Sequence, residues 1–252
     1  YHTVMKAYHQ AQFRDDTAQQ LQRLMTKVED SWATTSDTSV RPNCHIYNIV
    51  LNAYAKSGTN AMSLLHHMKK NVAPDIVSYT TVLESLAKSP TPGNTAAPSV
   101  ALSLLDEIQD NKLRPNLRTY TMVIQTFANH HGNIVVARQV LDRLLQDNQA
   151  THDPVLKPST HPYNYVLNCA ANAIDNKMEA FKIAAKTFRE LRANDDLELD
   201  SYTFAFWIKC IHNLVDDREL KIKCFRQCIT EVKQGGMLNY IILSRLRQTC
   251  PE

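Results

Sequence analysis

Cysteine and histidine are the residue types in this sequence that most invite a chemical role, because thiolates and imidazoles bind zinc. Cys224 and Cys228 are four residues apart, which places them on one face of a helix, and Cys210 and His212 lie nearby in the sequence. A zinc site would need four such ligands in a tight group. We favour packing instead, in which the cysteines act as small hydrophobic side chains at positions held elsewhere by leucine, methionine or alanine.

The ten histidines also raise the possibility of acid–base catalysis. The pairs His66-His67 and His130-His131 are expected on a helix surface and in a turn, without an accompanying carboxylate or nucleophile pattern. The sequence lacks a phosphate-binding glycine loop, a zinc-hydrolase helix motif and a nucleophile elbow. We therefore predict that the chain is not an enzyme, and that it uses no metal, no cofactor and no small-molecule substrate.

Composition favours helices as the elements that position the remaining polar residues. The chain has 252 residues, of which 44% are hydrophobic and 21% are charged, but it has only five glycines. The formal net charge of +3 is too small to indicate a nucleic-acid partner by itself, so any such site must be a local basic surface. No apolar stretch is long enough to cross a membrane. The chain begins at Tyr1 without a targeting segment, so we expect the true N-terminus to lie upstream.

One pattern recurs along the chain and predicts a stack of helical hairpins. Each copy opens with an aromatic residue and carries apolar residues three, four and usually seven positions later, as in Tyr47, Val50, Leu51 and Tyr54. This spacing is typical of a helix that buries one face, and we call these the first helices. The six opening aromatics are Tyr1, Tyr47, Tyr79, Tyr120, Tyr163 and Phe204.

A turn and a second apolar stripe follow each first helix, as in Ala101, Leu104, Leu105 and Ile108. Most copies then close with a proline, which cannot continue a helix. The polar or proline-rich stretches 31–40, 89–97 and 146–155 are expected to be surface insertions, and Lys69-Lys70 and Arg138 are expected on a solvated outer face. The predicted fold is all-α, with repeats at 1–43, 44–75, 76–116, 117–159, 160–200 and 201–234, followed by a capping helix within 235–252.

The segments 41–58 and 73–86 closely resemble the pentatricopeptide repeat, and the other copies resemble it less completely. The resemblance implies a right-handed superhelix, or α-solenoid, in which the first helices line a concave groove. It also implies that each repeat binds one base of single-stranded RNA.

The resemblance assigns three sets of residues to RNA. The residue after the opening aromatic would read a base together with the last residue of the same repeat, which gives the pairs Asn48 with Asp75, Thr80 with Asn116, Thr121 with Ser159, and Asn164 with Asp200. The residue two before the aromatic would flank the base, which gives His45, Val77, Arg118, His161 and Tyr202. Lys56 and Lys88 would contact phosphate, and this electrostatic attraction would weaken toward the C-terminus, where Asn129, Asn172 and Asn213 replace them.

The family's code implies uracil for the pairs that join Asn to Asp and adenine for Thr80 with Asn116, with a purine preferred by Thr121 with Ser159. Residues such as Asp75 and Asn116 also cap helix N-termini, so capping is an alternative explanation for the second member of each pair. Capping leaves unexplained the Asn or Thr that follows each aromatic, since a position within a helix has no special need for these types.

Three functions remain open from the sequence. The first is sequence-selective RNA binding in organellar RNA metabolism, in mitochondria or plastids, which rests on the family resemblance. The second is a protein-binding scaffold, or a structural subunit of an organellar ribosome or another large complex. The third is the repeat part of a larger enzyme such as a protein-only ribonuclease P, although the aspartate cluster of its nuclease is absent from these residues.

Overall fold

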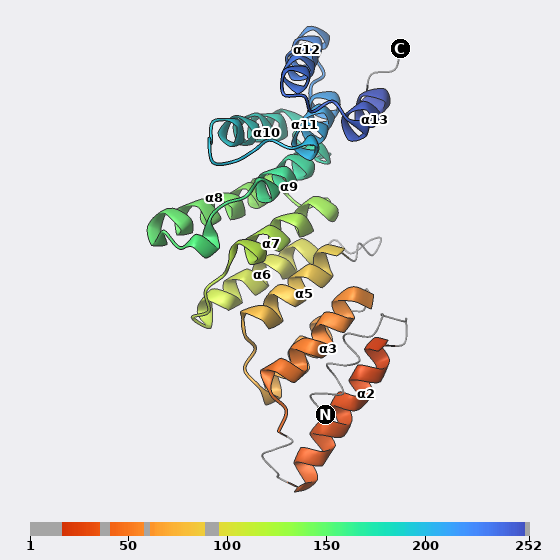
Figure 1. Ribbon diagram of the computed structural model, residues 1–252, viewed down its shortest axis with the longest axis vertical. Helices are drawn as coiled ribbons and strands as arrows, with labels where there is room; N and C mark the ends of the chain where they lie inside the picture. Colours follow the sequence, from red (N-terminus) through yellow and green to blue (C-terminus); the bar gives the residue numbers. More distant parts are fainter. Residues whose placement is uncertain (1–16, 36–40, 58–60, 89–95, 250–252) are drawn as a thin grey trace. The chain divides into compact units, whose positions relative to one another are not determined.

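The computed structural model of the chain describes residues 17–35, 41–57, 61–88 and 96–249, and these residues form helices without a β-strand (Figure 1). The all-α prediction is therefore confirmed. The first helix of the first repeat, the turn residues Gly58 and Gly93, and Cys250 lie outside the described residues. The helices fall into two compact units, which we describe separately.

The first unit contains the helices of the first three hairpins. These helices are α2 (Thr17–Thr35), α3 (Cys44–Ser57), α4 (Ala61–Asn71), α5 (Ile76–Lys88) and α6 (Ala97–Asp110). The first helices α3 and α5 pack against each other, while α3 also contacts α2 and α4. The side chain of Glu107 connects α6 to this group, because it accepts hydrogen bonds from Tyr79 and Lys69.

The second unit continues the same alternation of first and second helices. It contains α7 (Leu117–Asn129), α8 (Ile134–Thr151), the short 3-10 helix η2 (Pro154–Leu156), α9 (Thr160–Ala171), α10 (Lys177–Arg192), α11 (Ser201–Leu214), α12 (Arg218–Gln234) and α13 (Tyr240–Thr249). The first helices α7, α9 and α11 pack in succession, and α13 packs on α11 (Figure 1). The C-terminal helix α13 thus extends the row of first helices.

The opening aromatics form the core of the hairpins. Tyr47, Tyr79, Tyr120 and Phe204 are among the largest fully buried side chains, and Tyr163 is also buried. Burying a side chain of this size contributes roughly 1.5–3 kcal/mol, provided that any polar atom finds a partner.

Three of the tyrosine hydroxyls find such a partner in a carboxylate. Tyr47 donates to Glu29 at 2.5 Å, Tyr79 donates to Glu107 at 2.8 Å, and Tyr120 donates to Asp147. All three carboxylates lie on second helices, namely α2, α6 and α8. The tyrosine therefore links the two helix layers with both its ring and its hydroxyl.

Side-chain caps define where the first helices begin. A side-chain oxygen at the end of the preceding repeat accepts a hydrogen bond from a backbone N–H three residues later, as the donors Ile46, Ser78, Thr119 and Thr203 show. The capping residues are Asn43, Asp75, Asn116 and Asp200. Ser159 precedes α9 in the same position but makes no such hydrogen bond. The capping alternative is thus correct for four of the five residues, and it leaves their other contacts to be examined.

Two expectations about the hairpin surfaces need correction. Residues 31–35 belong to α2 and residues 146–151 belong to α8, so neither segment is part of an insertion, and η2 follows α8 almost directly. Arg138 is only 6% exposed, instead of lying on a solvated face, because its guanidinium bonds Asp142 on its own helix and Thr187 and Glu190 on α10. Charge pairing and hydrogen bonding offset the cost of burying this cation.

Within the described residues, no helix combines the length and the apolar character that a bilayer crossing requires.

Candidate nucleic-acid interface

Two hairpins, one in each unit, hold an asparagine against an aspartate. Asn48 on α3 donates from Nδ2 to both carboxylate oxygens of Asp75, at 3.1 and 3.3 Å. Asn164 on α9 makes the same contact with Asp200, at 3.0 and 3.2 Å. In both cases the aspartate also caps the next first helix, so one carboxylate fixes both a helix start and an amide. The sequence pairs Asn48 with Asp75 and Asn164 with Asp200 are therefore in direct contact.

A serine completes the group around Asn48. The hydroxyl of Ser78 lies 2.6 Å from Asn48 Oδ1 and 3.0 Å from Asp75 Oδ1. Burial by itself raises the pKa of Asp75. Hydrogen bonds from the Ser78 backbone, Cys44 and Asn48 lower it by more than burial raises it, so the pKa lies below its ordinary value. The Asp75 carboxylate is consequently held in its charged, accepting form.

The corresponding group around Asn164 lacks one hydrogen bond. The hydroxyl of Thr203 occupies the place of Ser78, but it donates to Asp200 at 2.9 Å and does not reach the amide. Asn164 is 5% exposed, and its Oδ1 is a buried acceptor without a hydrogen-bond partner. An unsatisfied buried acceptor costs on the order of 1–3 kcal/mol. The amide therefore has an unused acceptor, which a ligand N–H group reaches only when the side chains that cover it move.

The two threonines in the base-reading position bond to their own helices. Thr80 Oγ1 donates to the carbonyl of Ile76, and Thr121 Oγ1 donates to that of Leu117, each at 2.7 Å. Both residues are 7% exposed. A hydroxyl that donates still has lone pairs, so the buried Thr121 hydroxyl can also accept a hydrogen bond.

The remaining two sequence pairs behave differently from the Asn–Asp pairs. Thr80 belongs to the first unit and Asn116 to the second, so each is described only within its own unit. Asn116 caps α7 with a side-chain bond from the Thr119 backbone at 2.9 Å. Within the described residues, no hydrogen bond joins Thr121 to Ser159.

All five residues in the flanking position are exposed. Val77 and Tyr202 have 53% and 56% of their surface accessible, in contrast to the buried Thr80, Thr121 and Asn164. The others are His45, Arg118 and His161. On α3, α5, α7 and α9, a buried or half-buried polar residue is thus preceded, three residues earlier, by an exposed flat, branched or cationic side chain.

The two lysines in the phosphate position differ in their surroundings. Lys56 is exposed at the end of α3. Lys88 is also exposed, but its ammonium pairs with Glu84 on the same helix at 2.5 Å. Such an exposed pair within one helix is worth only about 0.3–0.5 kcal/mol, so phosphate can compete with it.

The cysteines occupy packing positions. Cys169, Cys210 and Cys228 are buried, and the first two direct their thiols to the backbone carbonyls of Gly132 and Leu167. Burial raises the pKa of Cys169 and of Cys228 to about 12, which keeps them as uncharged thiols. Among the described residues, no group of three or more His, Cys, Asp and Glu side chains is placed to hold a metal ion.

Two polar residues of this interface were missed by the sequence argument. One is Ser78, whose contact with Asn48 spans two helices and has no local sequence signal. The other is Asn239, which accepts hydrogen bonds from the backbones of Ile241 and Ile242 and so starts α13. Asn239 therefore stands, relative to α13, where Asp200 stands relative to α11. The spacing from Asn239 to Leu243 could have revealed it, because every opening aromatic from Tyr47 onward lies four residues after such a position.

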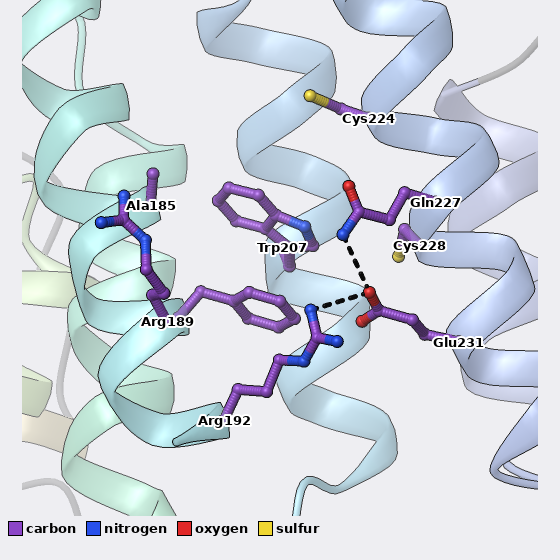
Figure 2. A pocket seen from close by; sticks show the side chains of 9 residues that line it. Ala185, Arg189, Arg192, Trp207, Cys224, Gln227, Cys228 and Glu231 are labelled. Carbon is purple, nitrogen blue, oxygen red and sulfur yellow. Dashed lines mark hydrogen bonds and ion pairs between the residues drawn. The ribbon is translucent and has the colours of Figure 1, made fainter.

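A small hollow lies away from the base-reading residues, between α10, α11 and α12 (Figure 2). Its volume is about 170 Å³, and Trp207 lies between the side chains of α10 and α12. The Trp207 ring stacks on Phe188, with centroids 4.7 Å apart. Arg192 pairs with Glu231 at 2.9 Å across the opening. This hollow is small and bridged by an ion pair, so we do not assign it to the RNA interface.

Comparison with known protein families gives two matched segments. Residues 42–88 match the model described as "PPR repeat family", and residues 103–173 match "Pentatricopeptide repeat domain". The matched segments contain Asn48, Asp75 and Asn164, whereas Asp200 lies beyond them. No curated protein sequence matches the chain significantly.

The fold is shared with a solved structure. The crystal structure of the pentatricopeptide repeat protein PPR10 from maize is similar with a TM-score of 0.57 and 18% sequence identity, over 94% of this chain and 32% of that chain. PPR10 in complex with an 18-nt psaJ RNA element is similar with a TM-score of 0.49 and 17% identity, over 92% of this chain and 35% of that chain. The chain thus spans about a third of the length of these structures.

Proposed function

We propose that this chain, a pentatricopeptide repeat protein, binds single-stranded RNA along the exposed side of its first helices and selects bases there. One observation carries the proposal: an Asn that follows the opening aromatic is held by the Asp that ends the same repeat, and this arrangement occurs once in each unit. Helix capping requires the aspartate but gives no reason for the asparagine.

The hydrogen bonds explain how such a pair would select a base. A carboxylate is only an acceptor, so it binds the Nδ2 end of the amide and fixes the orientation of the asparagine. In Asn164 the Oδ1 end then remains as an acceptor for a ring N–H, such as N3–H of uracil, whereas at Asn48 the base would replace the Ser78 hydroxyl. The family's code, as the resemblance implies it, assigns Asn48 and Asn164 to uracil, Thr80 with Asn116 to adenine, and Thr121 with Ser159 to a purine.

The contrast in exposure provides a place for the base. An exposed side chain, such as His161 or Tyr202, would stack on the face of a base while the base edge reaches the buried polar group. Stacking of this kind contributes on the order of 1–3 kcal/mol per base. Lys56 and Lys88 would contact the phosphate groups of the same strand, which would make binding depend on salt.

The proposed cellular role is non-catalytic. The family resemblance favours organellar RNA metabolism in a mitochondrion or a plastid, where the chain would protect a transcript or assist its processing or translation. The protein scaffold of the sequence argument becomes the favoured function if no RNA binds.

Binding to short RNAs tests the proposal directly. Fluorescence anisotropy with a panel of single-stranded RNAs, titrated with salt, should show a preference for tracts that contain U and A over C-only RNA, and weaker binding to matched DNA. Exchanging Asn48 for Thr while Asp75 is kept should move one site from U toward G by about tenfold in relative affinity, since one hydrogen-bond donor and acceptor set replaces another. The variant Asn148→Thr, on second helix α8, is the matched control.

Charge reversal separates phosphate contacts from base selection. Replacing Lys56 and Lys88 with Glu should weaken the binding of every RNA by a similar factor and reduce the slope of log affinity against log salt. The order of preference among the RNAs should not change. An Asn48→Thr variant that ranks every RNA as the parent does would contradict the base assignment.

A further inference from the structure

The inner stripe of α11 differs from those of the earlier first helices. Tyr202, Phe206 and Lys209 follow one another at spacings of four and three residues, which places them on one helix face. The base-reading position of this repeat holds Ala205, which has no polar side-chain atom. The rings of Tyr202 and Phe206 lie with centroids 6.4 Å apart at an interplanar angle of 32°. This face therefore offers two aromatic rings beside a base-reading position that has no hydrogen-bonding group.

Lys209, on the same face, supplies a positive charge at a phosphate position where the sequence has asparagine instead of lysine. Asn172 stands nine residues after Tyr163, in the place of Lys56 and Lys88 in their repeats. The ammonium of Lys209 donates to Asn172 Oδ1 at 2.5 Å. A lysine on α11 thus brings a positive charge to the phosphate position of the preceding helix, α9.

A second cation, Arg245, lies on α13, which packs against α11. Burial lowers the pKa of Lys209, and the positive charge of Arg245 lowers it further. Lys209 bonds Asn172 and Arg245 bonds Gln248, both neutral side chains, and within the described residues neither cation forms an ion pair with a carboxylate. Two partly buried like charges without a counter-charge favour an anion between them.

We propose that α11 and α13 form a nucleotide site that holds one RNA nucleotide without selecting its base. Tyr202 and Phe206 stack on the base, and Lys209 and Arg245 contact the phosphate. This inference rests on the proposed RNA binding and adds one nucleotide next to the base assigned to Asn164. The sequence predicted that electrostatic attraction would weaken toward the C-terminus. In this proposal, Lys209 and Arg245 supply that attraction from other helix positions.

The test compares a four-nucleotide RNA, UAAU, with RNAs that are one nucleotide longer at either end. Addition at one end only should raise the affinity about tenfold, by nearly equal factors for A, C, G and U, while an abasic extension should give little of this gain. The full chain is used throughout, with anisotropy as the readout.

Matched variants identify the residues. Phe206→Ala should remove most of the gain from the added base and leave UAAU binding within about threefold, whereas Tyr240→Ala, which removes an 80% exposed tyrosine from α13, should change neither. Tyr202→Ala should remove the same gain and also weaken UAAU binding, because Tyr202 flanks a base in the proposed function. Tyr202→Phe should retain the gain, which excludes a general loss of folding. Lys209→Gln and Arg245→Gln should each reduce the slope of log affinity against log salt by about 0.7, unlike the control Lys182→Gln on α10.

The outcomes distinguish a failure of the nucleotide site from a failure of the proposed RNA binding. If no RNA binds at any length, both fail. If UAAU binds but an added nucleotide gives no gain at either end, or a gain for one base alone, then the nucleotide site is wrong and the proposed RNA binding stands.

Discussion

The two asparagine–aspartate pairs use the same residues, but their hydrogen bonding is complete in one unit and incomplete in the other. In the first unit, Ser78 adds a hydroxyl to Oδ1 of Asn48 at 2.6 Å. In the second unit, Thr203 bonds only Asp200, and Oδ1 of Asn164 has no partner. A two-residue code treats these repeats as equal, whereas the residue before the next opening aromatic decides how strongly the asparagine is already engaged.

The side-chain chemistry of serine and threonine offers a reason. Threonine is branched at Cβ, which restricts the rotamers that its hydroxyl can adopt in a helix. Serine has no methyl group at this position, so its hydroxyl reaches the amide as well as the carboxylate. Under the proposed function, an RNA base at Asn48 would compete with the Ser78 hydroxyl, while a base at Asn164 would bond an acceptor that has no partner among the described residues.

A similar difference separates the ion pairs that connect neighbouring second helices. In the first unit, Lys69 pairs with Glu107 at 2.5 Å, and their side chains are 25% and 33% exposed. In the second unit, the Arg138 side chain is 7% exposed and bonds Asp142, Thr187 and Glu190. The second pairing is the more buried, so its loss leaves more polar groups without water or a partner.

The largest expected effect follows from that contrast. Arg138→Ala should lower the free energy of unfolding of the second unit by about 2–4 kcal/mol, because it leaves Glu190 and Thr187 without their cationic donor, while Lys69→Ala should cost at most about 1 kcal/mol. Hydrogen exchange of the α8 and α10 amides measures the first effect, and exchange of the α4 and α6 amides measures the second. Arg138→Met, which keeps the apolar stem, should lose less than Arg138→Ala. Equal losses at Arg138 and Lys69 would contradict the burial argument.

A smaller effect tests the serine directly. A double-mutant cycle of Asn48→Ala and Ser78→Ala should give a coupling energy of about 0.5–1.5 kcal/mol, as expected for one hydrogen bond between neutral groups. The parallel cycle of Asn164→Ala and Thr203→Ala should give about 0.5 kcal/mol or less, because the two side chains meet only through Asp200. Chemical denaturation followed by local hydrogen exchange supplies the four stabilities of each cycle. A larger coupling in the second unit would reverse the comparison.

The smallest expected effect concerns acid. Because the folded pKa of Asp75 lies below its ordinary value of 3.8, the carboxylate stabilises the fold at pH values above 3.8, and this contribution is lost as the pH falls through the folded pKa. NMR titration should therefore place the Asp75 carboxyl below 3.8, and Asp75→Asn should reduce the acid sensitivity of the α3 and α5 amides. The control Asp106→Asn, on the exposed side of α6, should leave that sensitivity unchanged. A titration midpoint above 3.8 would show that burial outweighs the hydrogen bonds.

The hairpins themselves were accessible from the sequence, because each one follows from a local pattern. An aromatic residue such as Tyr120, with apolar residues three, four and seven positions later, gives a helix with one buried face wherever it occurs. The Asn or Asp before each first helix also gave the correct helix start in four repeats. The contacts of Asn48 and Asn164 were implied by the family resemblance, and the structure places both against their aspartates.

The interface depended on packing between segments that are far apart in the sequence. Arg138 was expected at the surface because it is a charged residue on a second helix. It is buried because α10 packs against it at Thr187, which lies 49 residues further along the chain. The contact from Lys209 to Asn172 crosses 37 residues and has no local signal. The contact from Ser78 to Asn48 also has no local signal, although this one hydroxyl gives Asn48 Oδ1 its hydrogen-bond partner.

By itself, the sequence determined the helices, their hairpin pairing and the polar residues that recur on the first helices, since these depend on spacings within a few turns of one chain segment. The tertiary structure decided which of those polar groups are satisfied, which charges are buried and which cations gather beside α11. Those properties depend on the distance between side chains of different helices, and a shift of one hydroxyl or one methyl group is enough to change them.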